Sequence, residues 1–471
     1  MFEPVIAPSG TLLGLLQRGR GDGTLHALTA PRAEALAALD HCVLNDPRRD
    51  WQVENRSLYY ARLYLDLDGA LDEIERHLFD PEDLLEDETR TGLALSVLGH
   101  LASYGRQDAV LLLRRYAATG SNWTWALDEL ALRDDDAGLR ALAVPVLARF
   151  PAGTEGDTAL ATALRDAFEP RPWRLWADDP RPGVGDRVRA AQENASFDRW
   201  QRQLSSSGPR PEWNVQAVLD WAEQGAQRGT PLYGPAARCL VAVAQPADRP
   251  LLVEAARSGP DGARCTALRY LAGAHDPQAL DLIEAAAQDS SPVVVEAALS
   301  AFERMRSVAA VERARRWAQR PDALGAAAGR VLACRGAVRD RDLVLDALRE
   351  AVRGDGPDAD TLCPLVDGAG RLGLRCAAPV LRHVYRETSS SHLRGRTARA
   401  LAATDPSFAA GFAVECLWDC EESTRELAAR YAETGDARVA ERLRRLASDP
   451  AEVDDVQVAV RSRITPDAPS A

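Results

Sequence analysis

The 471-residue sequence contains no lysine, so all 57 of its basic residues are arginine. This bias is typical of GC-rich coding sequence. It excludes a Walker A phosphate lysine, a pyridoxal-phosphate Schiff base and a serine–lysine nucleophile pair, because each of these needs the amine. The eight cysteines are scattered and form no CxxC motif. Cys416 and Cys420 are four apart on a predicted helix, which indicates packing rather than a disulfide or a metal site. Free thiols of this kind predict a cytoplasmic protein.

Catalytic and metal-binding motifs are also missing. The seven histidines form no HExxH, HxH or His-Glu pair, and the chain has no GxSxG. We therefore predict no metal site and no cofactor. The net charge of −13 argues against a nucleic-acid partner, which would need a strongly basic face. The apolar run at 11–16 is too short to be a signal peptide or a membrane span, so we expect no membrane association.

Short helical units punctuated by proline fill residues 260–305, and the pattern recurs along most of the chain. Asp276-Pro277 and Ser291-Pro292 each place a capping side chain before a proline. This order predicts a helix start at which the Asp or Ser oxygen accepts a hydrogen bond from a free backbone N–H. The 3–4 spacing of apolar residues gives each helix one stripe: Leu280, Ile283 and Ala287 on one, and Val294, Ala298, Phe302 and Met305 on the next.

Equivalent positions recur at a fixed interval. Leu268 and Leu299 are 31 residues apart, as are Asp405 and Asp436. A helix of three to four turns with one apolar stripe is marginal alone and must be buried against neighbours. A period in the low thirties with two helices per unit therefore predicts an all-α fold: an α-solenoid, or superhelix, of antiparallel helix pairs.

The segment ALRYLAGAHDPQAL at 267–280 resembles the short HEAT-like repeats that are also found in phycobilisome lyases. The match is good over 264–300 and 93–113, fair over 397–445 and poor between 151 and 211. The resemblance implies HEAT-like repeats of about 31 residues. Such repeats serve binding scaffolds and a few enzymes alike, so the resemblance implies a fold rather than one activity.

Composition divides the chain into four parts. Residues 1–150 and 212–464 are predicted to be HEAT-like helical repeats, and 465–471 a disordered tail. Residues 151–211 form a Pro/Trp/Arg-rich interruption with one amphipathic helix, because prolines at 170, 172, 180 and 182 predict no regular helix over 169–182. The Asp-Leu-Asp-Gly run at 66–69 resembles the nucleophile loop of haloacid-dehalogenase phosphatases. Its flanks are helical and no βαβ pattern follows, so we interpret it as a turn between helices.

Two stretches carry candidate partner contacts. Residues 121–129 begin the second helix of a repeat, which lines the concave face in HEAT-like solenoids. Trp123 and Trp125 are two apart and so point to different sides, while Asp128 and Glu129 lie one turn beyond Trp125. HEAT-like alkylpurine DNA glycosylases also place a Trp and an Asp on a concave helix, but the spacing differs and the acidic balance opposes DNA docking.

The segment 169–182 is the richest Trp/Arg cluster in the chain. It is either a structural plug between two solenoid arms, with its tryptophans buried, or a recognition loop, since Trp and Arg dominate interface hot spots. The residues predicted to contact a partner are Trp123, Trp125, Asp128, Glu129, Arg171, Trp173, Arg174 and Trp176.

Two functions are consistent with these features. The favoured hypothesis is a non-enzymatic cytoplasmic scaffold or adaptor that binds a protein partner along its concave face. The alternative is a lyase-like enzyme that uses the solenoid groove as a substrate pocket, with Asp128, Glu129 and nearby Arg or Trp as working groups. A closed pocket lined by Trp125 and Asp128 with a shifted carboxylate pKa would favour the enzyme, and a smooth open groove would favour the scaffold.

Overall fold

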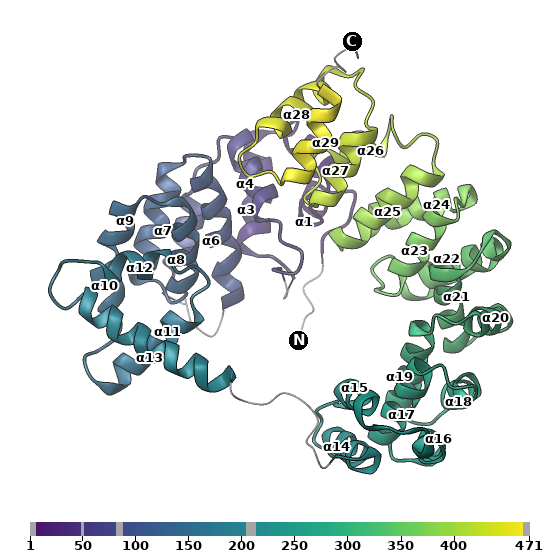
Figure 1. Cartoon of the computed structure of the whole chain (residues 1–471). Helices are drawn as coiled ribbons and strands as arrows, with labels where there is room; N and C mark the ends of the chain where they lie inside the picture. The colour runs from purple at the N-terminus through teal and green to yellow at the C-terminus, as the bar shows by residue number, and fades with distance from the viewer. Residues whose placement is uncertain (1–5, 49–50, 82–87, 204–212, 465–471) are drawn as a thin grey trace, which may run out of the picture. The chain divides into compact units, whose positions relative to one another are not determined.

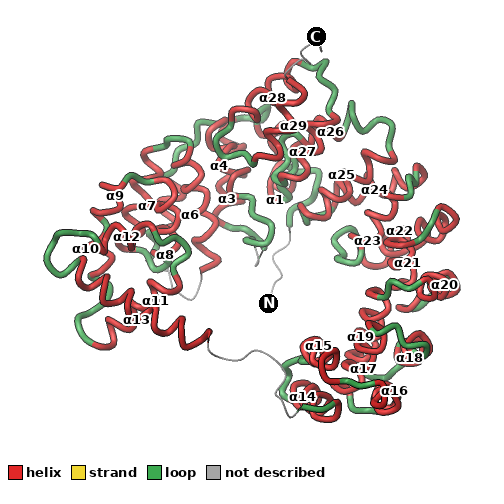
Figure 2. The backbone as a smooth tube through the Cα atoms, viewed as in Figure 1, coloured by secondary structure: helices red, strands yellow, loops and turns green. Residues whose placement is uncertain are grey.

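A computed structural model describes residues 6–48, 51–81, 88–203 and 213–464. Within these ranges all regular structure is helical, with α1 to α29, three short 3-10 turns and no strand (Figure 2). The predicted all-α class is therefore confirmed. The predicted tail at 465–471 and the end of the interruption at 204–211 lie outside the described residues.

The chain forms two compact units (Figure 1). Unit 1 comprises Met1–Ser205, Arg386–Ala398 and Pro406–Ala471, and unit 2 comprises Ser206–Tyr385 and Arg399–Asp405. The helices of unit 1 are α1 (Leu12–Gln17), α2 (Gly21–Ala27), α3 (Arg32–Leu44), α4 (Ser57–Asp66), α5 (Asp72–Leu78), α6 (Glu88–Ser103), α7 (Gln107–Thr119), α8 (Trp123–Arg133), α9 (Asp136–Ala141), α10 (Ala143–Leu147), α11 (Thr154–Asp166), α12 (Arg171–Ala177), α13 (Gly185–Gln203), α26 (Phe412–Cys416), α27 (Glu422–Tyr431), α28 (Ala437–Ser448) and α29 (Asp454–Ile464).

Unit 2 shows a regular packing order. Its helices are α14 (Val215–Gln227), α15 (Tyr233–Val243), α16 (Arg249–Ser258), α17 (Asp261–Gly273), α18 (Ala279–Ala286), α19 (Pro292–Arg304), α20 (Val308–Trp317), α21 (Ala323–Arg335), α22 (Arg341–Asp355) and α23 (Leu362–Arg371), while α24 (Ala378–Glu387) and α25 (Ser391–Thr404) have residues in both units. α17 packs on α19, α19 on α21 and α21 on α23, so alternate helices form one row. α18, α20 and α22 pack beside this row (Figure 1). Helices therefore pack sequentially, as repeated helix pairs do.

The apolar stripe of α19 explains this packing. Val294, Ala298, Phe302 and Met305 are all buried, as their spacing predicts. Burying such a stripe stabilises the helix by about 1.5–3 kcal/mol for each large side chain. The stripe, rather than intrinsic helix propensity, thus holds α19 between α17 and α21.

The two predicted capping pairs have different outcomes. Asp276 does accept a backbone hydrogen bond, from Gln278 at 2.8 Å, but Pro277 lies in the turn and α18 begins only at Ala279. Pro292 is the first residue of α19, yet the Ser291 hydroxyl does not cap it. That hydroxyl instead donates to Asp261 at 2.6 Å, so a contact with α17 replaces the local cap.

The expectation that prolines exclude a helix from 169–182 is wrong. α12 spans Arg171–Ala177, with Pro172 in its first turn. A proline there loses no hydrogen bond, because the first N–H groups of a helix have no intrahelical acceptor. The run at 66–69 is a turn between helices, as interpreted: Asp66 ends α4, and Asp68 follows in a left-handed conformation with φ 47°.

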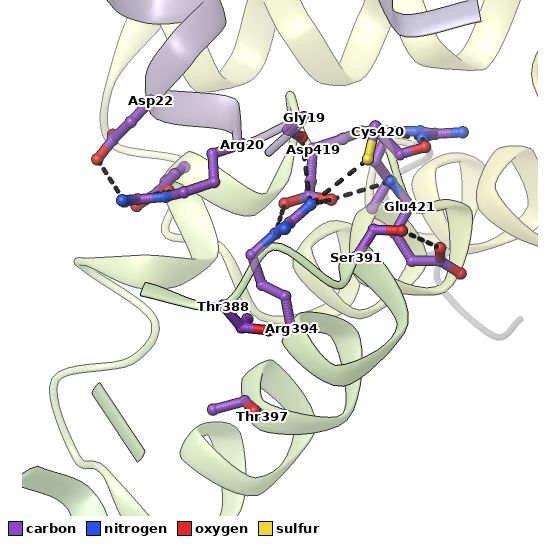
Figure 3. A network of polar contacts seen from close by, with 12 residues as sticks. Gly19, Arg20, Asp22, Thr388, Ser391, Arg394, Thr397, Asp419, Cys420 and Glu421 are labelled. Atoms are coloured by element: carbon purple, nitrogen blue, oxygen red, sulfur yellow. Dashed lines mark hydrogen bonds and ion pairs between the residues drawn. The ribbon is translucent and has the colours of Figure 1, made fainter. Parts of the chain in front are cut away.

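Within unit 1, residues from the two ends of the chain meet in a buried polar network (Figure 3). Arg394 makes a two-pronged ion pair with Asp419, at 2.7 and 3.0 Å, and neither side chain is exposed. The carbonyl of Gly19 accepts from Arg394 and from the backbone N–H of Cys420. Gly19 has φ 67°, and a side chain there would collide with Cys420. Glycine therefore allows the N-terminal turn to lie against this loop.

None of the helices in the described ranges combines the length and the apolar character that a membrane crossing requires.

Candidate functional site

One face of α8 carries most of the candidate site. Trp125, Asp128, Glu129 and Leu132 occupy positions i, i+3, i+4 and i+7, so they share that face. Trp125 stacks at a tilt on Trp51, with ring centroids 5.4 Å apart. Trp51 comes from the segment before α4 and is buried. Two distant segments thus supply one aromatic wall.

Two glycines of α6 make room for these side chains. A side chain at Gly92 would come within 2.8 Å of the Trp51 ring, and one at Gly99 would collide with the carboxylate of Glu129. The two positions lie two helical turns apart, on the same side of α6. Their lack of a side chain lets Trp51 and Glu129 lie directly on the helix.

These elements line a half-open pocket of about 720 Å³, which we call the aromatic–acidic pocket. Its volume lies within the range of small-ligand sites, about 300–1,000 Å³. Its aromatic and apolar lining is Trp51, Trp125, Leu132 and Phe168, and its polar lining is Gln52, Asn55, Ser96, Asn122, Thr124, Asp128, Glu129, Arg133 and Glu169. Phe168 is 82% exposed and Leu132 59% exposed, so apolar surface continues outward from the pocket.

The carboxylate of Asp128, on the pocket side of α8, has no arginine paired with it among the described residues. It accepts a hydrogen bond from the backbone N–H of Glu169 at 3.0 Å, and it takes part in no ion pair within the described ranges. Burial raises the pKa of Asp128 to about 6, and the nearby Glu169 carboxylate acts in the same direction. By contrast, Asp134 at the end of the same helix is paired with Arg114 at 2.5 Å.

Glu129 has a fuller set of partners. It forms an ion pair with Arg133 at 2.5 Å and accepts from the Ser96 hydroxyl at 3.0 Å. That hydroxyl in turn accepts from the Trp125 indole N–H at 3.1 Å. Burial nevertheless raises the pKa of Glu129. With Arg133 matched to Glu129, the carboxylates of Asp128 and Glu169 leave the pocket with excess negative charge.

The structure brings three of the predicted contact residues together and separates the others. Trp125, Asp128 and Glu129 line the aromatic–acidic pocket. Trp123 points to the other side of α8, as the two-residue spacing predicts, and lies edge-on to Trp173 with ring centroids 6.3 Å apart. Trp123 is therefore outside the pocket.

The aromatic cluster of 169–182 is part of the core. Trp173 and Trp176 are buried, and the Trp176 indole N–H donates to the carbonyl of Leu139 at 2.7 Å. Arg171 donates to the carbonyls of Ala131 and Asp134 at the end of α8 and pairs with Asp136. Arg174 is exposed. This burial favours the plug interpretation for the two tryptophans.

Sequence reasoning missed Trp51 and Phe168. Both lie in segments without a periodic pattern, more than 30 residues from α8 in the chain. The available signal was the pair Gly92 and Gly99, because glycines two turns apart in a helix mark a close approach by another element.

Comparison with protein-family models gave no match, and comparison with curated proteins gave no relative. The site must therefore be interpreted from its own geometry. Among the described residues, no group of three or more His, Cys, Asp or Glu side chains is arranged to hold a metal ion.

Proposed function

We propose that the chain is an α-solenoid of HEAT-like helix pairs that works as a binding protein in the cytoplasm. In this proposal a protein partner inserts a basic side chain, arginine or lysine, into the aromatic–acidic pocket. The alternate-helix packing of unit 2 and the 31-residue interval support the solenoid. The eight cysteines are free thiols, which supports a reducing compartment.

The observation that carries the proposal is the half-buried Asp128 carboxylate without a cation. Two fully buried carboxylates of unit 1 are matched to arginine, Asp419 with Arg394 and Glu452 with Arg425, and the half-buried Asp40 accepts a hydrogen bond from the Tyr64 hydroxyl. A desolvated charge without a partner is unfavourable, so natural proteins rarely keep one unless a ligand supplies the counter-charge. An incoming cation would restore the pairing.

The walls of the pocket match the rest of a basic side chain. A guanidinium or ammonium group is attracted to the faces of tryptophan rings, by about 0.5–2 kcal/mol. Trp51 and Trp125 supply such rings beside Asp128. The exposed Phe168 and Leu132 extend apolar surface past the pocket, and contiguous apolar surface of this kind marks protein-interaction sites. These features favour a basic residue flanked by apolar ones over a free amine.

Selection of a linear peptide library on the intact chain tests the proposal. We expect the selected peptides to share an arginine or lysine next to an apolar residue. Asp128→Asn and Trp125→Ala should each weaken their binding by about tenfold, equivalent to about 1.4 kcal/mol. Enrichment of acidic peptides, or equal affinity for Asp128→Asn, would refute it.

Asp72→Asn is the matched control. Asp72 is an exposed carboxylate of the same unit and lies outside the pocket. Its removal changes the net charge by the same amount as Asp128→Asn. If the peptide cation pairs with Asp128 itself, Asp72→Asn should leave peptide affinity unchanged. A loss of affinity equal to that of Asp128→Asn would indicate only long-range attraction to an acidic chain.

One observation favours the lyase-like enzyme as a second candidate. A half-open pocket lined by Trp125 and Asp128 is present, and the Asp128 pKa of about 6 lies near neutrality, where a general acid or base works best. The two candidates differ in the effect of Asp128→Asn. An enzyme would lose turnover of a bound ligand and keep its affinity, whereas a binding protein loses the affinity itself.

A further inference from the structure

A basic hollow lies in unit 2, apart from the aromatic–acidic pocket. Its volume is about 320 Å³. Arg269 comes from α17, His275 from the turn after α17, and Arg304 and Arg306 from the end of α19. Ala301 and Met305 are buried and supply apolar lining. Three arginines and a histidine thus line the hollow around a small apolar floor.

These three arginines differ from most others in unit 2. Arg264 pairs with Asp289 at 2.5 Å, and Arg315 pairs with Asp340 at 2.7 Å. By contrast, the side chains of Arg269, Arg304 and Arg306 make no ion pair or hydrogen bond within the described residues. Their charges are therefore available to a ligand.

The acidic side chains beside the hollow are already engaged. Asp276 binds Arg249 through both carboxylate oxygens, at 2.5 and 3.0 Å. Glu303 accepts two hydrogen bonds from Arg330, at 2.8 and 2.6 Å. Neither carboxylate is left to neutralise the hollow. A local positive potential therefore persists in a chain whose net charge is −13.

The backbone of His275 gives an independent indication. The turn after α17 has His275 with φ 55°, in the left-handed region. Four other helix-ending turns with the same hydrogen-bond pattern have glycine at this position, namely Gly19, Gly105, Gly229 and Gly373, and a fifth has Asp68. A non-glycine residue in this conformation is strained, and such strain concentrates at ligand sites. At this turn an imidazole stands where glycine would be unstrained.

We infer that the basic hollow binds the phosphate group of a small phosphorylated ligand. Guanidinium groups match phosphate oxygens in geometry and form strong charge-assisted hydrogen bonds. Three guanidinium groups carry more positive charge than one carboxylate would neutralise, whereas a phosphate dianion matches them better. The small volume suits a small ligand, and Ala301 and Met305 fit a short apolar portion of it. This site goes beyond the proposed partner binding and does not depend on it.

Isothermal titration of the intact chain with pyrophosphate tests the site. We expect a dissociation constant below about 1 mM at constant ionic strength, and weaker binding of the dicarboxylate succinate. Arg304→Ala and Arg306→Ala should each weaken pyrophosphate binding about tenfold, since each removes a charge-assisted hydrogen bond. Arg316→Ala, an exposed arginine of α20 outside the hollow, is the matched control and should bind like the wild type.

Three results would overturn the inference: no pyrophosphate binding at about 1 mM, tighter binding of succinate, or an equal loss of affinity in Arg316→Ala. His275→Gly separates ligand binding from folding. Glycine relieves the left-handed strain, so the thermal midpoint should hold or rise while pyrophosphate affinity falls severalfold. A raised midpoint with unchanged affinity would refute the place of His275 in the site.

Discussion

Replacing Asp128 by asparagine should stabilise the free protein while it removes the affinity of the aromatic–acidic pocket for a cation. Asparagine keeps the shape of the side chain and has an oxygen that can accept the hydrogen bond from the Glu169 N–H. In the wild type this bond to Asp128 is 3.0 Å long. The substitution removes the charge that burial disfavours. The variant should therefore gain stability at neutral pH and lose function, the usual trade-off at a binding site.

The magnitude follows from the raised pKa. Burial raises the pKa of Asp128 from 3.8 to about 6. Each pKa unit corresponds to about 1.4 kcal/mol, so the full shift would amount to about 3 kcal/mol. Because the side chain is partly exposed, solvent screening reduces this figure, and we expect a gain of about 1 kcal/mol. That gain corresponds to a rise of about 2–4 °C in the thermal midpoint.

The effect should depend on pH in a definite direction. Above pH 6, Asp128 is ionised in both the folded and the unfolded chain, and the folded state carries the full penalty. Between pH 6 and pH 4 the folded state takes up a proton before the unfolded state does, so the penalty decreases. The wild type should therefore approach the stability of Asp128→Asn as the pH falls to 4.

Thermal unfolding of both proteins across this pH range is the assay, and Asp134→Asn is the control. The carboxylate of Asp134 is paired with Arg114, so its loss should lower the midpoint at neutral pH. A lower midpoint for Asp128→Asn at pH 7, or a gain independent of pH, would refute the argument that Asp128 lacks a counter-charge.

Three further predictions concern the rest of the chain. Trp173→Ala with Trp176→Ala should destabilise unit 1 by about 3–5 kcal/mol for each ring, and a thermal midpoint within a few degrees of wild type would contradict their burial. Asp419→Asn should lower the free energy of unfolding by about 3–5 kcal/mol in denaturant titrations, because it leaves Arg394 charged and buried. Binding to duplex DNA at physiological salt should be undetectable at micromolar protein by fluorescence anisotropy, and tight, salt-sensitive binding would contradict the charge argument.

The helical class and the pocket-lining face of α8 were predictable because both follow from local spacing. A 3–4 pattern of apolar residues determines the buried side of a helix, as on α19. The same geometry puts Trp125 and Asp128 on one face of α8. The opposite wall of the pocket was not predictable, because Trp51 reaches Trp125 across more than 70 residues of chain and no local pattern encodes that contact.

The proline-rich segment shows a different limit of prediction from sequence, namely where a helix begins. The prolines of 169–182 were interpreted as helix breakers, yet α12 begins next to one of them. A proline is unfavourable inside a helix and acceptable in its first turn, so its effect depends on where the helix starts. Tertiary contacts set that start: Arg171 binds the end of α8, and Trp176 binds Leu139. Sequence alone could not place the boundary.

The contact between the two chain ends could not be predicted from the sequence either, because it too depends on tertiary contacts. A linear array of repeats leaves its first and last helices without a neighbour on one side. In unit 1, Arg20 pairs with Glu415 at 2.7 Å, and Arg62 pairs with Asp449 at 2.8 Å. These partners are almost 400 residues apart in the chain. The ends of the chain thus cover each other.

Ion pairs at this contact have a different consequence from an apolar contact. A buried ion pair adds little net stability, because removing two charges from water offsets most of their attraction. An apolar contact tolerates a shift of one helix past another, whereas any shift here would separate Arg20 from Glu415 and leave the Glu415 carboxylate buried without its arginine. The pair therefore determines which surfaces meet. Arg394 also donates to the Gly19 carbonyl at 3.3 Å, so it takes part in the contact between the chain ends. We expect Arg394→Met with Asp419→Leu to restore most of the stability that Asp419→Asn loses. Loss of the hydrogen bond to Gly19 should make the contact between the chain ends less specific, with broader amide resonances for residues near Gly19.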